Sequence, residues 1–560
     1  ARHQTLRRAI DWSYDLLTSD EQKLFRRLCI FVGGCTLEEA EEVCGGSGDI
    51  DVLDQLSSLV DKSLLRQIAN ETPEPRFAPL ETIRQYGLER LREHSEEDAF
   101  RRRHRDCFLA LAELAEPRLT SAEQGQWFGR LAREQGNLRA ALDWSEGQHE
   151  SKEAVRLGLA LWRYWLVRGD QTEGRRRLER LLTAPEAMGR TAVRARLLTS
   201  IAMLAQNQSG YASSRALLED GLEIWRSLGN KGEIAASLNH LGWMAHRLGE
   251  PGRAEKLSEE ALGLHRELGD RRGIAVSLNN LGWSAHLNGQ LLSAKSYHEQ
   301  AANLRRAIGD VRGAAFSLTN LAWAVHCLGD LGRATSLLVE AEGLLRPIGD
   351  KQLLAWALSL KAEVLHDRGD SAQAVQVLEE ALPLFRSIED TFGTAYTLGV
   401  MGKIARDAAQ PGRAEALLEE SLSYQLALES IAGVADALSR LGGIASARGD
   451  RTRATTLYEE SLATYRKIGA RLGVSRCLAG LAELAAGDND LERAARLLSL
   501  ADAMDQSTGR VLSPRSRIRR DRIIEGVRAG LGGAAFEAAW LSEKENSRNE
   551  AIGDDLTPPA

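Results

Sequence analysis

Apolar residues recur along much of the chain with the spacing of amphipathic helices. Leu238, Leu241 and Ala245 stand at i, i+3 and i+7, which places them on one face of a helix with 3.6 residues per turn. The next apolar stretch, marked by Ala254 and Ala261, follows the same rule. The pattern therefore predicts two helices in succession, each with one apolar face that needs a neighbour.

This helix pair is copied every forty residues. Alanine or serine recurs where two helices cross closely, and glycine recurs where a left-handed residue would end a helix. Because one pair cannot bury its apolar face alone, the copies are expected to stack into a solenoid. The alanine columns are Ala254, Ala294, Ala334, Ala374, Ala414, Ala454, Ala494 and Ala261, Ala301, Ala341, Ala381, Ser421, Ser461, Ala501, and the glycine columns are Gly249, Gly289, Gly329, Gly369, Gly449 and Gly229, Gly269, Gly309, Gly349, Gly469.

The first hundred residues follow a different pattern. Thr18 with Glu21, and Thr36 with Glu39, form two capping boxes that each predict the start of a helix. Three helices, a two-stranded wing and a closing helix are typical of a winged-helix domain. The periodicity and caps predict helices near 5–17, 19–31, 37–44 and 51–61, strands at 64–68 and 76–79, and a helix at 80–94.

The repeat resembles the tetratricopeptide repeat (TPR). Leu241-Gly242, Ala254 and Ala261 match the Leu-Gly pair, the first Ala and the second Ala of that motif. The units are longer than the usual ones of about thirty-four residues, as in the TPRs of kinesin light chains and bacterial regulators, and Gly-Asp replaces the motif's proline. The resemblance implies an all-α fold: a TPR α-solenoid, or superhelix of helix pairs, preceded by a small winged-helix domain.

Other segments resemble the part that follows the NB-ARC-type ATPase in bacterial STAND signal-transduction regulators. This family includes LuxR-type and antibiotic-pathway transcriptional regulators, and its members order an ATPase, a winged helix and a TPR sensor along one chain. The resemblance implies that this chain is the C-terminal part of such a regulator, with the ATPase upstream of Ala1. The matching segments are 9–17, 24–28, 31–34, 59–65, 80–86, Arg103-His104 and 531–540.

These patterns and resemblances divide the chain into five expected parts. They are a winged-helix domain at 1–95, a helical connector with degenerate TPR-like pairs at 96–190, a TPR array at 191–510, C-terminal capping helices at 511–540 and a disordered tail at 541–560.

Aromatic, amide and imidazole side chains form columns on the face opposite the apolar stripe. In TPR solenoids the first helix of each pair lines the concave surface, so the resemblance places these columns in the groove. Tryptophan is a frequent anchor in binding interfaces, which favours a partner-binding role. The candidate residues are Asn239, His240, Trp243, His246, Asn279, Asn280, Trp283, His286, Asn320, Trp323, His326 and His366.

Two other interpretations of these columns stay open. The tryptophans can instead fill gaps between neighbouring helices, because repeats copy whatever the parent unit holds. A zinc site from the histidines is disfavoured, since stacked helices lie about 8–10 Å apart whereas zinc ligands lie within about 2 Å of the metal.

The chain has no motif that predicts catalysis. It contains no G-x-x-x-x-G-K-[ST] loop, no G-x-S-x-G and no H-E-x-x-H, so we expect no enzyme activity, no metal and no cofactor in these residues. ATP or ADP is expected only in an upstream ATPase domain. Many relatives have a winged-helix histidine that touches the nucleotide, but Glu81 stands at the matching position here.

Charge and composition narrow the class of partner. The net charge is −7, and residues 1–100 hold 12 Lys and Arg against 20 Asp and Glu. The helix in the DNA-reading position carries Asp51, Asp54 and Asp61 and no arginine, so direct DNA binding is disfavoured. Two basic clusters, Arg101–Arg105 and Arg515–Arg522, predict solvated faces; the second alternatively contacts nucleic acid or an acidic partner.

The remaining features indicate a cytoplasmic protein. The six cysteines are scattered, which fits reduced thiols. No apolar run approaches the length of a membrane span and no signal peptide opens the chain. The sequence therefore predicts the interaction and sensor module of a cytoplasmic STAND-type regulator, which binds a partner protein, peptide or inducer in the TPR groove. The alternative is a DNA-binding regulator that acts directly through its winged helix.

Overall fold

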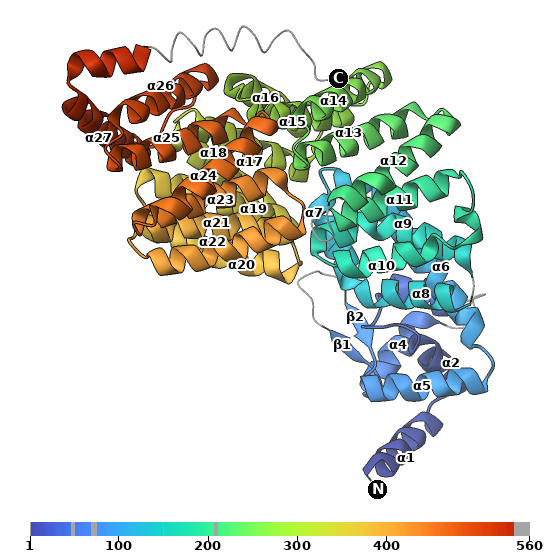
Figure 1. The fold of residues 1–560 in the computed structure, drawn as a ribbon. Coiled ribbons are helices and arrows are strands. Elements are labelled where there is room, and N and C mark those ends of the chain that lie inside the picture. Colours follow the sequence, from blue (N-terminus) through green and yellow to red (C-terminus); the bar gives the residue numbers. More distant parts are fainter. Residues whose placement is uncertain (1, 46–50, 69–74, 149, 207–210, 542–560) are drawn as a thin grey trace. The chain divides into compact units, whose positions relative to one another are not determined.

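The chain folds almost entirely into helices. The computed structural model describes residues 2–45, 51–68, 75–148, 150–206 and 211–541 (Figure 1). Contacts divide them into two compact units: most of the residues up to 188 form the first, and most of those from 189 onward form the second. None of the described helices is long and apolar enough to cross a membrane. Residues 542–560 of the predicted tail lie outside the described residues.

The first unit begins with the winged helix. Both capping boxes form, because Thr18 accepts from the Glu21 N–H and Thr36 accepts from the Glu39 N–H. The two strands pair antiparallel, as predicted for the wing. The elements are α1 (Arg2–Asp15), α2 (Ser19–Leu28), α3 (Leu37–Cys44), α4 (Val52–Asp61), β1 (Arg66–Ile68), β2 (Arg76–Ala78) and α5 (Glu81–Glu93).

The helices that follow α5 continue to pair, less regularly than those of the array. They are α6 (Glu97–Ala115), the 3-10 turn η1 (Glu116–Thr120), α7 (Gln124–Arg133), α8 (Gln135–Gly147), α9 (Ser151–Arg168), α10 (Gln171–Leu181) and the 3-10 turn η2 (Pro185–Ala187).

A buried polar network joins the wing to α7 and α8. Arg76 on β2 forms an ion pair with Glu134, and its second amino group donates to the Gly34 carbonyl at 2.8 Å. Asn137 donates to the same carbonyl at 3.0 Å and accepts from the Val32 N–H at 2.7 Å. Residues on both sides of position 95 therefore share one polar core.

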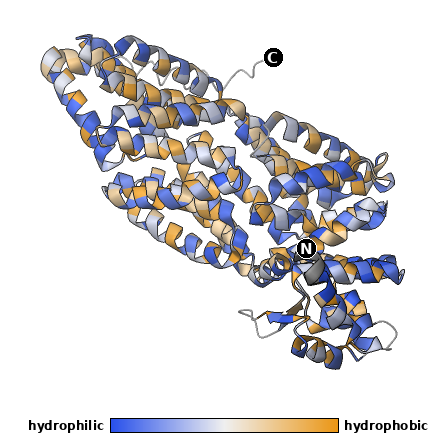
Figure 2. Cartoon of the chain, turned by 90° about the horizontal axis from the view of Figure 1, so that it is seen from below, coloured by the Kyte–Doolittle hydropathy of each residue, from blue (hydrophilic) through white to orange (hydrophobic). Residues whose placement is uncertain are grey.

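The second unit is a TPR solenoid, as predicted. Figure 2 shows hydrophobic and hydrophilic residues alternating around its helices, which is the pattern of amphipathic elements. The helices are α11 (Ala192–Ala205), α12 (Tyr211–Leu228), α13 (Lys231–Arg247), α14 (Pro251–Leu268), α15 (Arg271–Leu287), α16 (Leu291–Ala307), α17 (Val311–Cys327), α18 (Leu331–Ile348), α19 (Lys351–Arg368), α20 (Ser371–Ser387), α21 (Thr391–Asp407), α22 (Pro411–Ala427), α23 (Ile431–Ala447), α24 (Arg451–Lys467), α25 (Arg471–Gly487), α26 (Leu491–Thr508) and α27 (Pro514–Leu531).

The small-residue columns do what their spacing predicts. Every member of both alanine columns is buried, including Ser421 and Ser461. All ten glycines of the two glycine columns have positive φ, for example 75° at Gly289 and 65° at Gly269. The alanines thus let the two helices of a pair cross closely, and the glycines end the helices.

The solenoid turns back on itself. Residues 219 positions apart meet across successive turns: Ile388 lies against Gly169, Ile468 against Gly249 and Thr508 against Gly289. One turn of the superhelix therefore takes about five and a half forty-residue units. Because the turn is this tight, the first helices of the pairs face one another across a narrow interior.

Candidate ligand-binding cavity

The interior of the solenoid contains a cavity of about 700 Å³. Every first helix from α13 to α25 contributes to its wall, and so do the segment 510–523 and a few residues of the second helices, such as Tyr458 and Tyr465. This volume lies within the range of about 300–1,000 Å³ that is typical of small-molecule sites.

One part of the wall is aromatic. We call Trp283, Trp323 and Tyr396 the aromatic wall. The rings of Trp283 and Trp323 meet edge to face with centroids 4.7 Å apart, and the Trp323 and Tyr396 centroids are 6.3 Å apart. Edge-to-face contact is a favourable geometry for such rings. The tryptophans therefore pack on one another and also face the cavity, so gap filling and ligand contact are compatible.

Beside the aromatic wall lies a group of paired charges. The Lys403 ammonium lies 2.9 Å from Asp367 and 3.3 Å from Glu363, and the Tyr396 hydroxyl donates to Glu363 at 2.7 Å. Burial alone would raise the pKa of Glu363, but the charges of Lys403 and Arg440 lower it to about 2. The pKa of Asp367 is lowered too, so both carboxylates are ionised at neutral pH, and Lys403 together with Arg440, 3.9 Å from Glu363, balances their charge.

A second charged part holds more cations than carboxylates. We call Arg440, Arg476, Arg510 and Arg520 the arginine cluster. Asp436 accepts from Arg440 at 2.6 Å and from Arg476 at 2.5 Å. Asp505, which lies behind the wall, accepts from Arg520 at 2.5 Å and lies 3.6 Å from Arg510. Because Arg440 also lies 3.9 Å from Glu363, these four guanidinium groups share two carboxylates and part of the charge of a third.

The segment after α26 crosses the first helices and covers one side of the cavity. The Val511 N–H donates to the Cys327 carbonyl at 3.0 Å, which ties this segment to the end of α17. Arg515 at the start of α27 donates to the Ser371 hydroxyl at 3.2 Å. Chain from the last repeat thus closes over the middle repeats.

The structure brings five of the twelve predicted groove residues together on the cavity wall. Burial lowers the pKa of His246 and that of His286, which falls to about 4, so both rings are neutral at pH 7. The His326 ring contacts Asp367 at 2.9 Å. The five residues are His246, Trp283, His286, Trp323 and His326.

The amide column has a different role from the one predicted. Asn239 bonds to the His265 ring at 3.1 Å and accepts from Ser277, and Asn279 donates to Ser317 at 3.0 Å. The Asn280 amide donates to the Asn239 carbonyl at 2.8 Å. These amides face neighbouring units rather than the groove, because repeated polar positions of adjacent helices lie opposite one another.

The other predicted residues also lie off the cavity wall. His366 is buried between units, where its ring contacts Asp407 and the Ser371 hydroxyl, each at 2.9 Å. Trp243 packs against Trp283 with centroids 5.9 Å apart. His240 and Asn320 are absent from the wall too.

Apart from Arg517, Arg519 and Arg520 of the second basic cluster, the charged residues of the wall were missed by sequence reasoning. Glu363 and Lys403 continue the column of Trp243, Trp283 and Trp323 at the forty-residue spacing. Both residues could have been found by extending this column at the forty-residue spacing into the later repeats, although the residue type changes there. Arg440 likewise continues the column of Asn280 and Asn320, and Tyr396, Asp436 and Arg476 continue that of Phe316.

The two basic clusters predicted from the sequence have different surroundings in the structure. In the first, Arg101 pairs with Glu97 and Arg105 pairs with Glu150. Arg102 is exposed, but His104 and Arg105 are buried, so the prediction of a solvated face is wrong for these two residues. In the second, Arg519 pairs with Glu483 at 2.6 Å, and Arg517, Arg519 and Arg520 all line the cavity. Among the described residues, no three His, Cys, Asp or Glu side chains gather as metal ligands do.

The surface of the winged helix is acidic where a DNA-reading helix would be basic. Asp54 and Asp61 are exposed on α4, together with Leu53. Glu81 pairs with Arg84 at 2.8 Å, and this bond, with one from Gln85, lowers the pKa of Glu81 to about 2.

Comparisons with known families agree with the two folds. Residues 17–92 match the model of the winged helix-turn-helix domain. Residues 193–267, 246–307 and 353–426 match one model of the tetratricopeptide repeat, and residues 434–468 match another. The chain thus joins a winged helix-turn-helix domain to a TPR array.

Its curated relatives include mycobacterial regulators. A stretch of 258 residues is 38% identical to a protein of Mycobacterium tuberculosis named "Putative HTH-type transcriptional regulator", covering 43% of this chain and 28% of that protein. A Mycobacterium bovis protein of the same description gives the same values. An uncharacterised Mycobacterium tuberculosis protein is 35% identical over 105 residues, which are 18% of this chain and 26% of that one. The chain therefore spans about a quarter of the length of these relatives.

The solenoid fold is shared with a solved structure. A Rap protein complexed with competence and sporulation factor superimposes with a TM-score of 0.50 at 12% identity, over 64% of this chain and 98% of that chain. A STAND protein with a TPR sensor from Pyrococcus horikoshii aligns over 97% of this chain and 65% of that chain, at 14% identity and a TM-score of 0.33.

Proposed function

We propose that this chain is the ligand-sensing and protein-interaction part of a cytoplasmic transcriptional regulator of the STAND ATPase kind. The observation that carries the proposal is the cavity, which is enclosed by the first helices of successive repeats and by the segment 510–523. The partial identity to HTH-type regulators supports the regulatory context. A peptide, a segment of a partner protein or a small inducer would occupy the cavity.

The cavity suits a sensor because several repeats share it. A ligand that touches helices from opposite sides of the superhelical turn binds most tightly at one spacing of those helices. It therefore shifts the solenoid toward the conformation with that spacing, provided that its affinities for the two conformations differ. The closing segment 510–523 is tied to α17 through the Val511 N–H and would follow such a shift.

The aromatic wall gives a direct test with a neutral apolar probe. N-Phenyl-1-naphthylamine fluoresces when it leaves water, and we expect it to bind the full chain at one site. In the variant Trp243→Ala/Trp283→Ala/Trp323→Ala its affinity should fall at least about tenfold, since the indoles of Trp283 and Trp323 supply apolar contact and Trp243 packs behind Trp283. The exposed Trp12 supplies the control, Trp12→Ala, which should bind normally. Equal binding by wild type and the triple variant would contradict the proposal.

The ATPase context has its own test. The gene sequence that precedes Ala1 is expected to encode a G-x-x-x-x-G-K-[ST] loop, which would bind ATP or ADP outside the present residues. Its absence would remove the STAND assignment and leave the ligand cavity unaffected.

A second candidate function is direct DNA binding through the winged helix. The match of residues 17–92 to a winged helix-turn-helix model favours it, whereas the exposed Asp54 and Asp61 of α4 oppose it. Binding of duplex DNA by the full chain, strong at low salt and weakened by added salt, would support it. No binding at low salt would exclude it.

A further inference from the structure

We propose that the cavity binds an organic anion. Its acidic group would lie at the guanidinium groups of Arg476 and Arg510, and its apolar part would lie against Trp283 and Trp323. The inference rests on the proposed function, which places a ligand in the cavity, and adds the chemical class of that ligand.

The first argument is the charge of the wall. Nine lysine and arginine side chains line the cavity against four carboxylates, although the whole chain carries a net charge of −7. Positive charge is therefore concentrated on the wall of this cavity. Clefts lined by one sign of charge attract ligands of the other sign.

The second argument is that the carboxylates present do not satisfy these cations. Asp436 serves both Arg440 and Arg476, and the Nε of Arg476 has no hydrogen-bond partner among the described residues. Arg510 donates to the Leu472 carbonyl at 3.4 Å but lies 3.6 Å from Asp505, beyond hydrogen-bond length, while Arg520 holds that carboxylate at 2.5 Å. A guanidinium group withdrawn from water is costly unless an anion is paired with it.

Arg247 adds a further cation to the same wall. Its guanidinium group lies 3.1 Å from the centre of the Phe392 ring and donates to the Tyr211 hydroxyl at 2.9 Å. Within the part of the chain that the structure describes, Arg247 forms no ion pair with a carboxylate, although the charge of Asp390 acts on it from further away. The cavity therefore has unneutralised positive charge in two places.

The third argument is that the arginines and the aromatic wall are neighbours. Trp323 and Cys327 lie one turn apart on the same face of α17, and the Val511 N–H donates to the Cys327 carbonyl, which brings Arg510 beside that helix. The His286 ring lies 4.9 Å from Trp323, and the charge of Arg510 acts on the same imidazole. One ligand could therefore touch both parts of the wall.

These surroundings define the ligand as amphipathic. Guanidinium groups bind carboxylate and phosphate groups through paired hydrogen bonds, so either acid fits. The buried indole N–H of Trp283 has no hydrogen-bond partner among the described residues. A volume of about 700 Å³ suits a small molecule or a peptide of a few residues rather than a folded domain.

The test compares two fluorescent probes that differ in one acidic group. 8-Anilino-1-naphthalenesulfonate carries a sulfonate, and N-phenyl-1-naphthylamine is its neutral analogue. We expect the full chain to bind the anionic probe at one site. Arg476→Met and Arg510→Met should each weaken the anionic probe at least about tenfold and change the neutral probe less than about twofold, because only the charge contact is lost.

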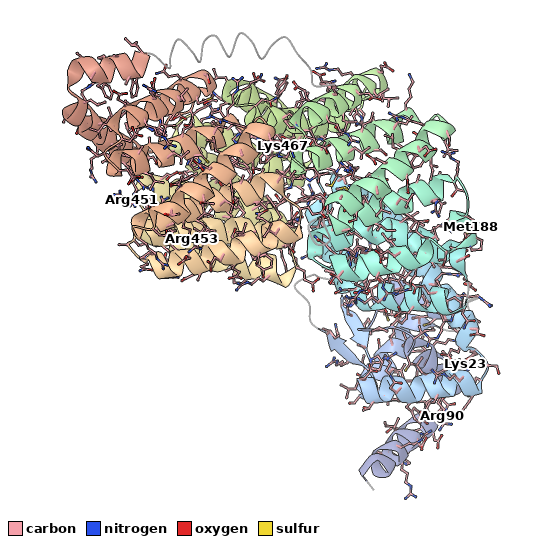
Figure 3. All side chains as sticks on the ribbon, viewed as in Figure 1. Lys23, Arg90, Met188, Arg451, Arg453 and Lys467 are labelled. Atoms are coloured by element: carbon pink, nitrogen blue, oxygen red, sulfur yellow. The ribbon has the colours of Figure 1, made fainter. Side chains whose placement is uncertain are left out.

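Matched variants separate loss of charge from loss of fold. Arg510→Lys retains the charge and should keep most of the affinity for the anionic probe. Arg453 on α24 (labelled in Figure 3) is exposed, pairs with Glu415 and does not line the cavity, so Arg453→Met should leave both probes unaffected. The far-UV circular dichroism of every variant should equal that of wild type, since partly unfolded chains also bind such dyes.

The possible outcomes distinguish this inference from the proposed function. If the neutral probe binds and the anionic probe does not, or if the arginine variants weaken neither probe, the anion site is wrong and the cavity stands. If neither probe binds the wild type, both proposals fall. Displacement of the anionic probe by octanoate or by octyl phosphate, and not by octanol, would support the anion site and identify the acid.

Discussion

Residues in the turns between helices show how the repeat tolerates change. At two positions of the first glycine column the residue is not glycine: Ala409, with φ of 55°, and Asn489, with φ of 62°, adopt the same left-handed conformation. A left-handed conformation costs a non-glycine residue about 1–2 kcal/mol. The backbone of the turn is therefore maintained by the stacking of the helices, even where the local sequence opposes it.

Replacing the strained residue with glycine should stabilise the array. We expect Ala409→Gly to raise the free energy of unfolding by about 0.5–1 kcal/mol, because relief of strain exceeds the added entropy of the unfolded chain. Urea denaturation measures the change.

Two reverse substitutions are the controls for Ala409→Gly. Gly449→Ala meets no neighbour and should lower the free energy of unfolding by about 1 kcal/mol. Gly289→Ala should cost more, since its Cβ would lie 2.4 Å from Thr508. Destabilisation by Ala409→Gly would contradict this account of the turns.

At the scale of elements, the sequence predicted those features that depend on residues close together along the chain and missed those that depend on distant residues. The helix pairs, their alanine crossings and both capping boxes follow from neighbours in sequence, so residues such as Ala254 and Thr36 identify them. The role of Asn239 depends on Ser277 in the next unit, and it was placed wrongly because periodicity does not say which polar face meets which. The joining of β2 to α7 and α8 likewise depends on contacts about sixty residues apart in sequence.

The buried polar network of Arg76, Glu134 and Asn137 should be essential for the stability of the first unit. In Glu134→Gln the buried Arg76 loses its counter-charge, and we expect the free energy of unfolding to fall by about 3 kcal/mol. Hydrogen exchange of the amides in α2 and α8 of the full chain, measured at increasing temperature, gives this change in the free energy of unfolding.

The control is an exposed pair of the same type. Glu89 pairs with Arg7 at 2.7 Å with both side chains about half exposed, so Glu89→Gln should cost less than about 1 kcal/mol. Equal effects of the two substitutions would mean that the buried network is dispensable.

At the scale of the whole second unit, the tight superhelix turns a row of repeats into an enclosed site. The forty-residue period predicts stacking, but the number of units per turn depends on small angles between helices that no single column encodes. The contact of Gly289 with Thr508 and that of Val511 with Cys327 are consequences of that turn. They are why Arg510, from beyond the last repeat, reaches a wall built by α15 and α17.

The most direct test of the central claim, that the interior of the solenoid is the ligand site, is hydrogen exchange of the full chain with and without saturating 8-anilino-1-naphthalenesulfonate. We predict slower exchange in α15, α17, α25 and the segment 510–523, which line the cavity, and unchanged exchange in α2, α3 and α4. Protection confined to other helices, or no change in the cavity helices at saturation, would contradict the account.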